Sequence, residues 1–136
     1  MTEQVVLQVE DDEANYFIFR ELFEEICPGI QLQRAQNGVE VIAMIRSLAE
    51  DPSMRLALVI LDVFLPLMNG WEVLASIRAV ESLKKIPVVM FTGQILDRDR
   101  KRSEELDVEY LQKPSDLRSL TLLVREICAR LELSLA

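Results

Sequence analysis

The sequence predicts a one-domain α/β protein in which helices cover both faces of a five-stranded parallel sheet. Five short runs rich in valine, isoleucine and leucine recur along the chain, and a segment with helically spaced apolar residues follows each run. Parallel strands need crossover connections, which are almost always right-handed. Five strand–helix units in succession therefore favour a three-layer, doubly wound arrangement.

The first unit is the apolar run that starts at residue 4, followed by a helix for which Asp12 is the expected N-cap. The Pro28–Gly29 pair ends this helix. The second strand starts at residue 30, and its helix follows the Asn37–Gly38 pair. The apolar residues with helical spacing in these two helices are Ile18, Phe19, Leu22, Phe23, Ile26, Ile42, Ile45 and Ala49.

The run that forms the third strand starts at residue 56, and its helix begins after Gly70. The fourth strand starts at residue 86. It is followed by residues 95–106, which have few apolar side chains, so this helix should pack weakly. The fifth strand starts at residue 108, and the last helix carries an apolar stripe made of Leu117, Leu120, Val124, Ile127 and Leu131.

Length and composition are those of a globular protein. The chain has 136 residues, of which 50% are hydrophobic and 28% are charged, so we expect one domain over residues 1–136 with no output domain. The longest uncharged apolar run, "LALVIL", is too short to span a bilayer. The first residues lack the basic start and apolar region of a secretory signal, which predicts a cytoplasmic location.

The charge and the missing histidine exclude several functions. The chain has 15 basic and 23 acidic residues and a net charge of −8, which disfavours nucleic acid and membrane surfaces as partners. It contains no histidine, so catalysis by Ser–His or Cys–His pairs is excluded. Cys27 and Cys128 lack metal-ligand spacing and are expected to be reduced thiols in or near the core.

Acidic residues follow the predicted first and third strands. Glu10 and Asp11 come directly after the first strand, and Asp62 comes after the third. In open parallel sheets, ligands bind outside the carboxyl ends of the strands. Carboxylates that meet in a cleft repel one another unless a cation neutralises them, and Mg²⁺ is commonly held by one or two carboxylates. We therefore expect a magnesium site here.

The residues that follow the third, fourth and fifth strands suit phosphoryl transfer. The carboxylate of Asp62 can attack phosphorus and become an acyl phosphate. Lys113 can place a positive charge on a phosphoryl oxygen, and the hydroxyl of Thr92 can donate a hydrogen bond to another. Taken singly, each of these residues is more often an ordinary cap, turn or surface residue.

Four stretches taken together resemble the CheY-like receiver domains of two-component response regulators. They are "VEDDE" from residue 9, "LDVFLPLMNGWEVL" around Asp62, "VVMFTG" from residue 88 and "YLQKP" from residue 110. The resemblance implies a flavodoxin-like sheet in the order 2-1-3-4-5. It also implies a switch that accepts a phosphoryl group from a sensor histidine kinase onto Asp62 with Mg²⁺. We expect a stand-alone regulator because the chain ends one helix after Lys113 and Pro114, and slow loss of the phosphoryl group because the bulky Phe64 stands two residues after Asp62.

The resemblance also assigns roles to individual residues. Asp11 and Asp62 would bind the metal together with the backbone carbonyl of Phe64, and Glu10 would act through water. Thr92 and Tyr110 would rearrange on phosphorylation, and with them the helix at residues 95–106 would shift and change the surface offered to a partner.

Two further positions are compared with the family pattern. The bond from Lys113 to Pro114 is usually cis in this family. Asp107 stands where these domains usually have a glycine, so the turn into the fifth strand is expected to differ.

Two other functions compete with the switch. A haloacid-dehalogenase-like phosphatase or phosphotransferase also forms an aspartyl phosphate, but it usually has an acid two residues after the nucleophile, where this chain has Phe64. A degenerate receiver used only for interaction would be expected to lack Asp11, Asp62 or Lys113, and all three are present. The leucines of the last helix, through Leu133 and Leu135, are consistent with a homodimer formed through that helix or the fifth strand. The downstream partner is not specified.

Overall fold

The five predicted strands form one parallel sheet in the order β2-β1-β3-β4-β5. The structure is a computed structural model and describes residues 2–135, with side chains through residue 133. The strands are β1 (Glu3–Val9), β2 (Gln31–Ala35), β3 (Met54–Leu61), β4 (Val88–Thr92) and β5 (Glu109–Gln112). The predicted doubly wound fold is therefore confirmed.

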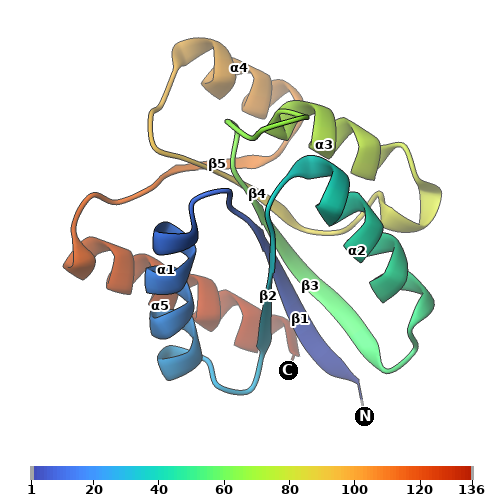
Figure 1. Ribbon diagram of the computed structural model, residues 1–136, viewed down its shortest axis with the longest axis horizontal. Helices are drawn as coiled ribbons and strands as arrows, with labels where there is room; N and C mark the ends of the chain where they lie inside the picture. Colours follow the sequence, from blue (N-terminus) through green and yellow to red (C-terminus); the bar gives the residue numbers. More distant parts are fainter. Residues whose placement is uncertain (1, 136) are drawn as a thin grey trace.

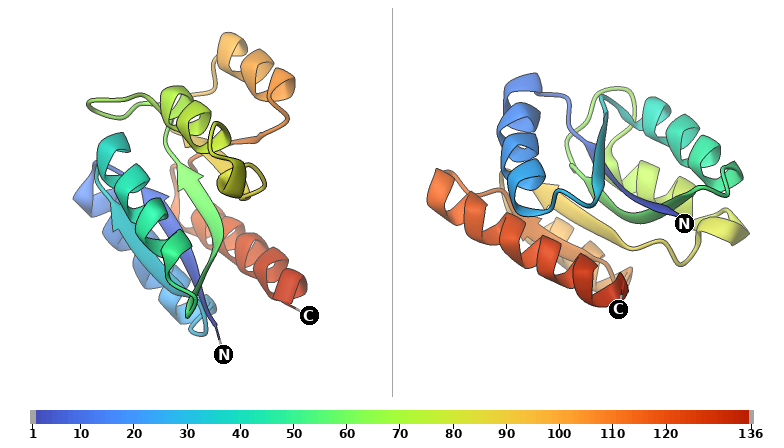
Figure 2. Two further views of the ribbon diagram at one scale, coloured as in Figure 1. Left: turned by 90° about the vertical axis from the view of Figure 1, so that its right-hand side faces the viewer. Right: turned by 90° about the horizontal axis from the view of Figure 1, so that it is seen from below.

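The helices form a layer on each side of this sheet. They are α1 (Glu13–Ile26), α2 (Gly38–Glu50), α3 (Gly70–Arg78), α4 (Asp97–Glu105) and α5 (Leu117–Leu135), with a short 3-10 helix, η1 (Glu81–Leu83). Figure 1 and Figure 2 show α1 and α5 together on one face, and α2 and α3 on the other with α4 beside α3. Among residues 2–135, no helix is long and apolar enough to cross a membrane.

The two faces of β1 bury different residues because side chains alternate along a strand. Val5 and Leu7 belong to the core under α2 and α3, whereas Val6 belongs to the core under α1 and α5. In the second core, Phe19 and Phe23 stack with their ring centroids 6.2 Å apart. Because β1 is central, both cores anchor it and fix the position of its carboxyl end.

The two cysteines lie in the core between α1 and α5. Cys27 and Cys128 are both buried and both are free thiols, as predicted. Burial, with Cys27 alongside, raises the pKa of Cys128 to about 12, so this thiol stays protonated at neutral pH.

Helix α4 packs weakly, as its composition predicts. Its only buried residues are polar, Asp99 and Ser103, while Leu106 at its end is 53% exposed. At the helix end the amide of Asp107 donates to the carbonyl of Glu104, and the amide of Val108 donates to that of Ser103. This is a Schellman ending, which needs a left-handed residue. Asp107 supplies it with φ 52°, so the missing glycine does not abolish the turn.

Helix α5 lies against α1 through only part of its predicted stripe. Val124, Ile127 and Leu131 are buried, but Leu117 is 63% exposed because the first turn of α5 projects past the strand ends. Leu133 is also exposed, and the side chain of Leu135 lies outside the described residues. A homodimer through α5 or β5 stays a prediction.

The loop from β3 to α3 contains a strained residue. Leu67 has φ 70° and is 78% exposed, and the amide of Met68 donates to the carbonyl of Pro66 at 2.8 Å. A bond between residues two apart around a positive φ defines a rare, strained γ-turn. A Cβ is unfavourable in this conformation, and glycine relieves the strain.

We predict that Leu67→Gly is more stable than Leu67→Ala by about 0.5–1 kcal/mol, which reverses the usual order of the two residues. The large exposure of Leu67 means that neither change removes much buried apolar surface. Urea denaturation of the two variants measures the difference. Equal stabilities, or a more stable alanine variant, would show that the turn is not strained.

Candidate functional site

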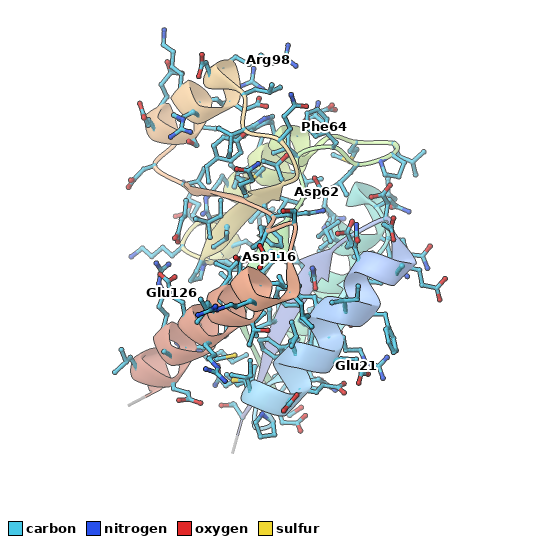
Figure 3. All side chains as sticks on the ribbon, turned by 90° about the vertical axis from the view of Figure 1, so that its left-hand side faces the viewer. Glu21, Asp62, Phe64, Arg98, Asp116 and Glu126 are labelled. Atoms are coloured by element: carbon cyan, nitrogen blue, oxygen red, sulfur yellow. The ribbon has the colours of Figure 1, made fainter. Side chains whose placement is uncertain are left out.

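The predicted acidic residues meet at the carboxyl edge of the sheet. Glu10 and Asp11 follow β1, and Asp62 follows its neighbour β3. One carboxylate oxygen from each lies within 4.8 Å of the others. Glu10 is 2% exposed and Asp62 is 7% exposed, whereas Asp11 is open to solvent. Figure 3 shows Asp62 between α4 and the beginning of α5, where Asp116 is labelled.

The backbone that carries Glu10 and Asp11 is held from both sides. Asp12 caps α1, as predicted, by accepting from the amide of Asn15 at 3.0 Å. On the other side Arg34, near the end of β2, donates to the carbonyl of Glu10 at 2.9 Å and to that of Asp11 at 3.1 Å. Sequence reasoning missed Arg34, although a charged side chain near the end of a strand adjacent to β1 was a usable signal.

Asp62 is positioned by its own loop. Its Oδ1 accepts from the amide of Phe64 at 3.0 Å. The amide of Gly70 donates to the carbonyl of Val63 at 2.8 Å, which closes the loop onto the start of α3. A side chain at Gly70 would collide with the carbonyl oxygen of Asp62, so this close approach requires glycine.

Lys113 connects the acids across the sheet. Its Nζ donates to Oδ2 of Asp62 at 2.6 Å and to Oε1 of Glu10 at 2.7 Å. Burial lowers the pKa of Lys113, but its hydrogen bonds to Asp62 and Glu10 and their charges outweigh this, so the pKa is raised. Lys113 therefore remains a cation. The role predicted for it requires that charge.

Burial changes the pKa of Glu10 more than its cationic partner Lys113 does. Desolvation raises the pKa of Glu10, and the charge of Asp62 adds to the effect, while the hydrogen bond from Lys113 opposes it. The net pKa is raised. Three acids with one lysine between them leave an excess of negative charge in a small space.

The composition of this cluster fits a magnesium site. Carboxylate oxygens are the hard ligands that Mg²⁺ prefers, and a divalent cation would neutralise the excess charge. Glu10, Asp11 and Asp62 are the side chains that could hold it.

The hydroxyls of Thr92 and Tyr110 both bond to the loop that follows β4. Thr92 is fully buried, and its hydroxyl donates to the carbonyl of Gln94 at 3.3 Å. The hydroxyl of Tyr110 donates to the same carbonyl at 3.4 Å and accepts from the amide of Leu96 at 3.3 Å. Both hydroxyls therefore hold the loop between β4 and α4, and Tyr110 is half-buried on the edge strand β5.

One expectation from the resemblance is wrong. No cis peptide bond occurs between residues 2 and 135, so the bond from Lys113 to Pro114 is trans. The amide of Lys113 still pairs with the carbonyl of Thr92 at 2.6 Å, which keeps Lys113 in line with the end of β4. Its ammonium reaches the acids from this trans backbone.

Trp71 and Asp99 form a buried contact that sequence reasoning missed. Trp71, in the first turn of α3, is 7% exposed. Its indole Nε1–H donates to Oδ1 of Asp99 on α4 at 3.0 Å, and its ring lies 6.3 Å from that of Tyr110. In the sequence, Asp99 is one of several acids in a helix of mixed charge, and nothing there indicates that its partner is Trp71.

The family model for the response regulator receiver domain matches residues 6–125. The response regulator Rcp1 of Synechocystis sp. is 34% identical over 126 residues, covering 91% of this chain and 86% of Rcp1. A structure of the Mn²⁺-bound form of Rcp1 is similar with a TM-score of 0.77 and 33% identity, covering 90% of each chain.

Two further relatives extend the comparison. The phosphorylated cyanobacterial phytochrome response regulator RcpA has a TM-score of 0.79 and 30% identity, covering 93% of this chain and 91% of RcpA. The probable transcriptional regulator ycf29 of Pyropia yezoensis is 31% identical over 103 residues, which are 75% of this chain and 44% of ycf29. The chain thus spans less than half of that relative.

We predict that Glu10→Gln unfolds at a higher urea concentration than the wild type at pH 7.5 without metal. A raised pKa means that the folded chain holds a proton on Glu10 at pH values where the unfolded chain has lost it, so ionised Glu10 opposes folding. The advantage of the variant should shrink as the pH falls through the raised pKa towards the ordinary value of 4.5.

The matched control is Glu25→Gln, which makes the same change at an exposed position of α1. It should not reproduce the gain at pH 7.5. A Glu10→Gln protein less stable than the wild type at this pH would mean that the ion pair with Lys113 outweighs the cost of burial.

Proposed function

Since the chain belongs to the receiver domain family of response regulators, we propose that it accepts a phosphoryl group on Asp62 from a sensor histidine kinase. The observation that carries this proposal is the double contact of Lys113 with Asp62 and Glu10, with Asp11 within 4.8 Å. RcpA, a similar protein, is described as a phosphorylated phytochrome response regulator, which supports a kinase of this class as the donor.

In the proposed reaction, an Asp62 carboxylate oxygen forms a bond to phosphorus while the bond from phosphorus to the donor histidine nitrogen breaks. That nitrogen keeps the bonding electron pair, and the product is an acyl phosphate. Lys113 stays charged and is free to move its ammonium from the carboxylate to a phosphoryl oxygen. A bound Mg²⁺ would neutralise charge on the phosphoryl oxygens. Asp11 and Asp62 would hold it together with the backbone carbonyl of Phe64, and Glu10 would act through water.

The surroundings of Asp62 favour a switch over a turnover enzyme. Phe64 stands where a phosphatase of the competing class would have its acid, and its side chain is 52% exposed. The cluster consists of the three carboxylates and Lys113 among the described residues, and position 64 adds no acid that could act as a general acid or base. Slow loss of the phosphoryl group to water is the proposed end of the cycle.

The loop between β4 and α4 would transmit the change. The Thr92 hydroxyl now donates to the carbonyl of Gln94, and a phosphoryl oxygen on Asp62 would be a charged, stronger acceptor for it. Losing the Thr92 bond frees a carbonyl that Tyr110 also contacts. Because α4 buries only polar residues, it can shift at low cost and alter the surface offered to a downstream protein.

We predict that acetyl phosphate with Mg²⁺ adds one phosphoryl group to the wild-type chain and none to Asp62→Asn, as measured by intact-protein mass spectrometry. Removing Mg²⁺ with a chelator should abolish the addition. Asp51→Asn, at the other end of β3, is the matched control and should be phosphorylated normally. Phosphorylation of the Asp62→Asn protein would overturn the assignment.

We also predict that beryllofluoride with Mg²⁺ changes amide hydrogen exchange in α4 and in the loop before it. The mimic occupies the place of the phosphoryl group and draws Thr92 towards Asp62. Helix α2 serves as an internal reference and should exchange at an unchanged rate. Identical exchange of α4 with and without the mimic would count against the proposed movement.

A further inference from the structure

Helix α4 carries an unusual group of cations for an acidic protein. Arg98, Arg100, Lys101 and Arg102 are all exposed, in a chain whose net charge is −8. Within residues 2–135, none of the four forms an ion pair. Arg98 and Arg102 are like charges four residues apart, and Arg98 lies near the positive end of the helix dipole. Both features oppose helix formation, so a contribution to folding stability does not explain why these cations are present.

The carboxylate of Asp99, in the middle of this group, is turned inward. It is 5% exposed, and its Oδ1 is held by the indole of Trp71. The guanidinium of Arg102 lies over the same indole, 5.5 Å from the ring centroid. Asp99 is thereby withdrawn from the surface, and the exposed acids of α4 lie at its two ends, Asp97 at the start and Glu104 and Glu105 in the last turn. The middle of the helix, residues 98–102, therefore presents only cations to solvent.

A pocket of about 330 Å³ opens beside these side chains. We call it the α4 pocket; Phe64, Asn69, Trp71, Arg98, Asp99 and Arg102 line it. Figure 3 shows Phe64 and Arg98 on neighbouring elements above Asp62. Within the described chain, the buried Oδ2 of Asp99 has no hydrogen-bond partner. A buried acceptor without a donor is unfavourable, so the contact between Trp71 and Asp99 at the back of the pocket does not satisfy the carboxylate fully.

We propose that the α4 pocket binds an acidic segment of another protein through a carboxylate and an adjacent apolar side chain. The carboxylate pairs with Arg98 and Arg102, whose guanidinium groups suit bidentate contacts. The apolar side chain packs on Phe64, which is 52% exposed. Arginine and aromatic residues are the types that dominate binding energy in protein interfaces.

A protein partner fits these observations better than nucleic acid. The cations cover only two turns of one helix, and the rest of the surface is acidic enough to repel a polyanion that extends beyond the pocket. A short acidic segment needs only the pocket itself, and it also uses the exposed apolar surface of Phe64.

The inference goes beyond phosphoryl transfer, because the residues that line the α4 pocket do not include Glu10, Asp11, Asp62 or Lys113. Binding can therefore be measured without modifying Asp62. Failure to phosphorylate Asp62 would leave this measurement intact, and failure to bind would leave the phosphorylation result intact.

The experiment uses a 15-residue amphipathic peptide of glutamate and leucine, and the same peptide with glutamine in place of glutamate. Trp71 is the only tryptophan of the chain, so its fluorescence and its indole N–H resonance report on the pocket directly. We expect saturable changes with a dissociation constant below about 1 mM for the acidic peptide and none for the glutamine peptide.

The matched variants are Arg98→Gln/Arg102→Gln and Arg100→Gln/Lys101→Gln, which remove the same charge from the same helix. The first pair should weaken binding by about tenfold and the second by less than about twofold. If the first variant does not fold, Arg98→Lys/Arg102→Lys replaces it. This variant keeps the charge but loses the bidentate geometry, and it should also bind more weakly than the wild type.

Three results would overturn the proposal. The first is the absence of any Trp71 signal change with acidic peptide up to about 1 mM. The second is an equal loss of binding in the two double variants, which would indicate unspecific attraction to the charge of the helix. The third is tighter binding of a 15-nucleotide oligothymidylate than of the acidic peptide, which would identify nucleic acid as the ligand.

Discussion

The site depends on one ammonium group held between two buried carboxylates. Lys113 extends from the end of the edge strand β5 and contacts residues that follow the central strands β1 and β3. Without this cation, the carboxylates of Glu10 and Asp62 would lie close together in a region of low dielectric constant, where their like charges repel strongly. The contact therefore connects the edge of the sheet to its centre, and the ammonium offsets the repulsion between the carboxylates.

The remaining contacts of the site serve to keep this arrangement in place. Arg34 holds the backbone after β1, and Gly70 lets the loop after β3 close tightly over Asp62. Both act on backbone groups, so the acids are positioned by rigid elements and not by one another. The two apolar cores supply the stability that offsets a buried, acidic and electrostatically strained edge.

Most of the fold, and the meeting of the acids with Lys113 at one edge of the sheet, could be predicted because they follow from local patterns. Hydrophobic periodicity located the strands and helices, and the shared edge of parallel strands brought Asp62 and Lys113 together. The roles of Arg34 and of the Trp71–Asp99 pair were not predictable in the same way. Their partners lie more than twenty residues away in the sequence, and no periodic pattern encodes which polar groups meet across such a distance.

The polar underside of α4 has a consequence for how such proteins diversify. Substitutions on its outer surface disturb little of the hydrophobic interior, because that interior hardly includes α4. Duplicated copies of the gene could thus acquire new binding specificities while the acidic site at the end of the sheet is inherited unchanged. One scaffold can in this way supply many signalling routes that stay insulated from one another.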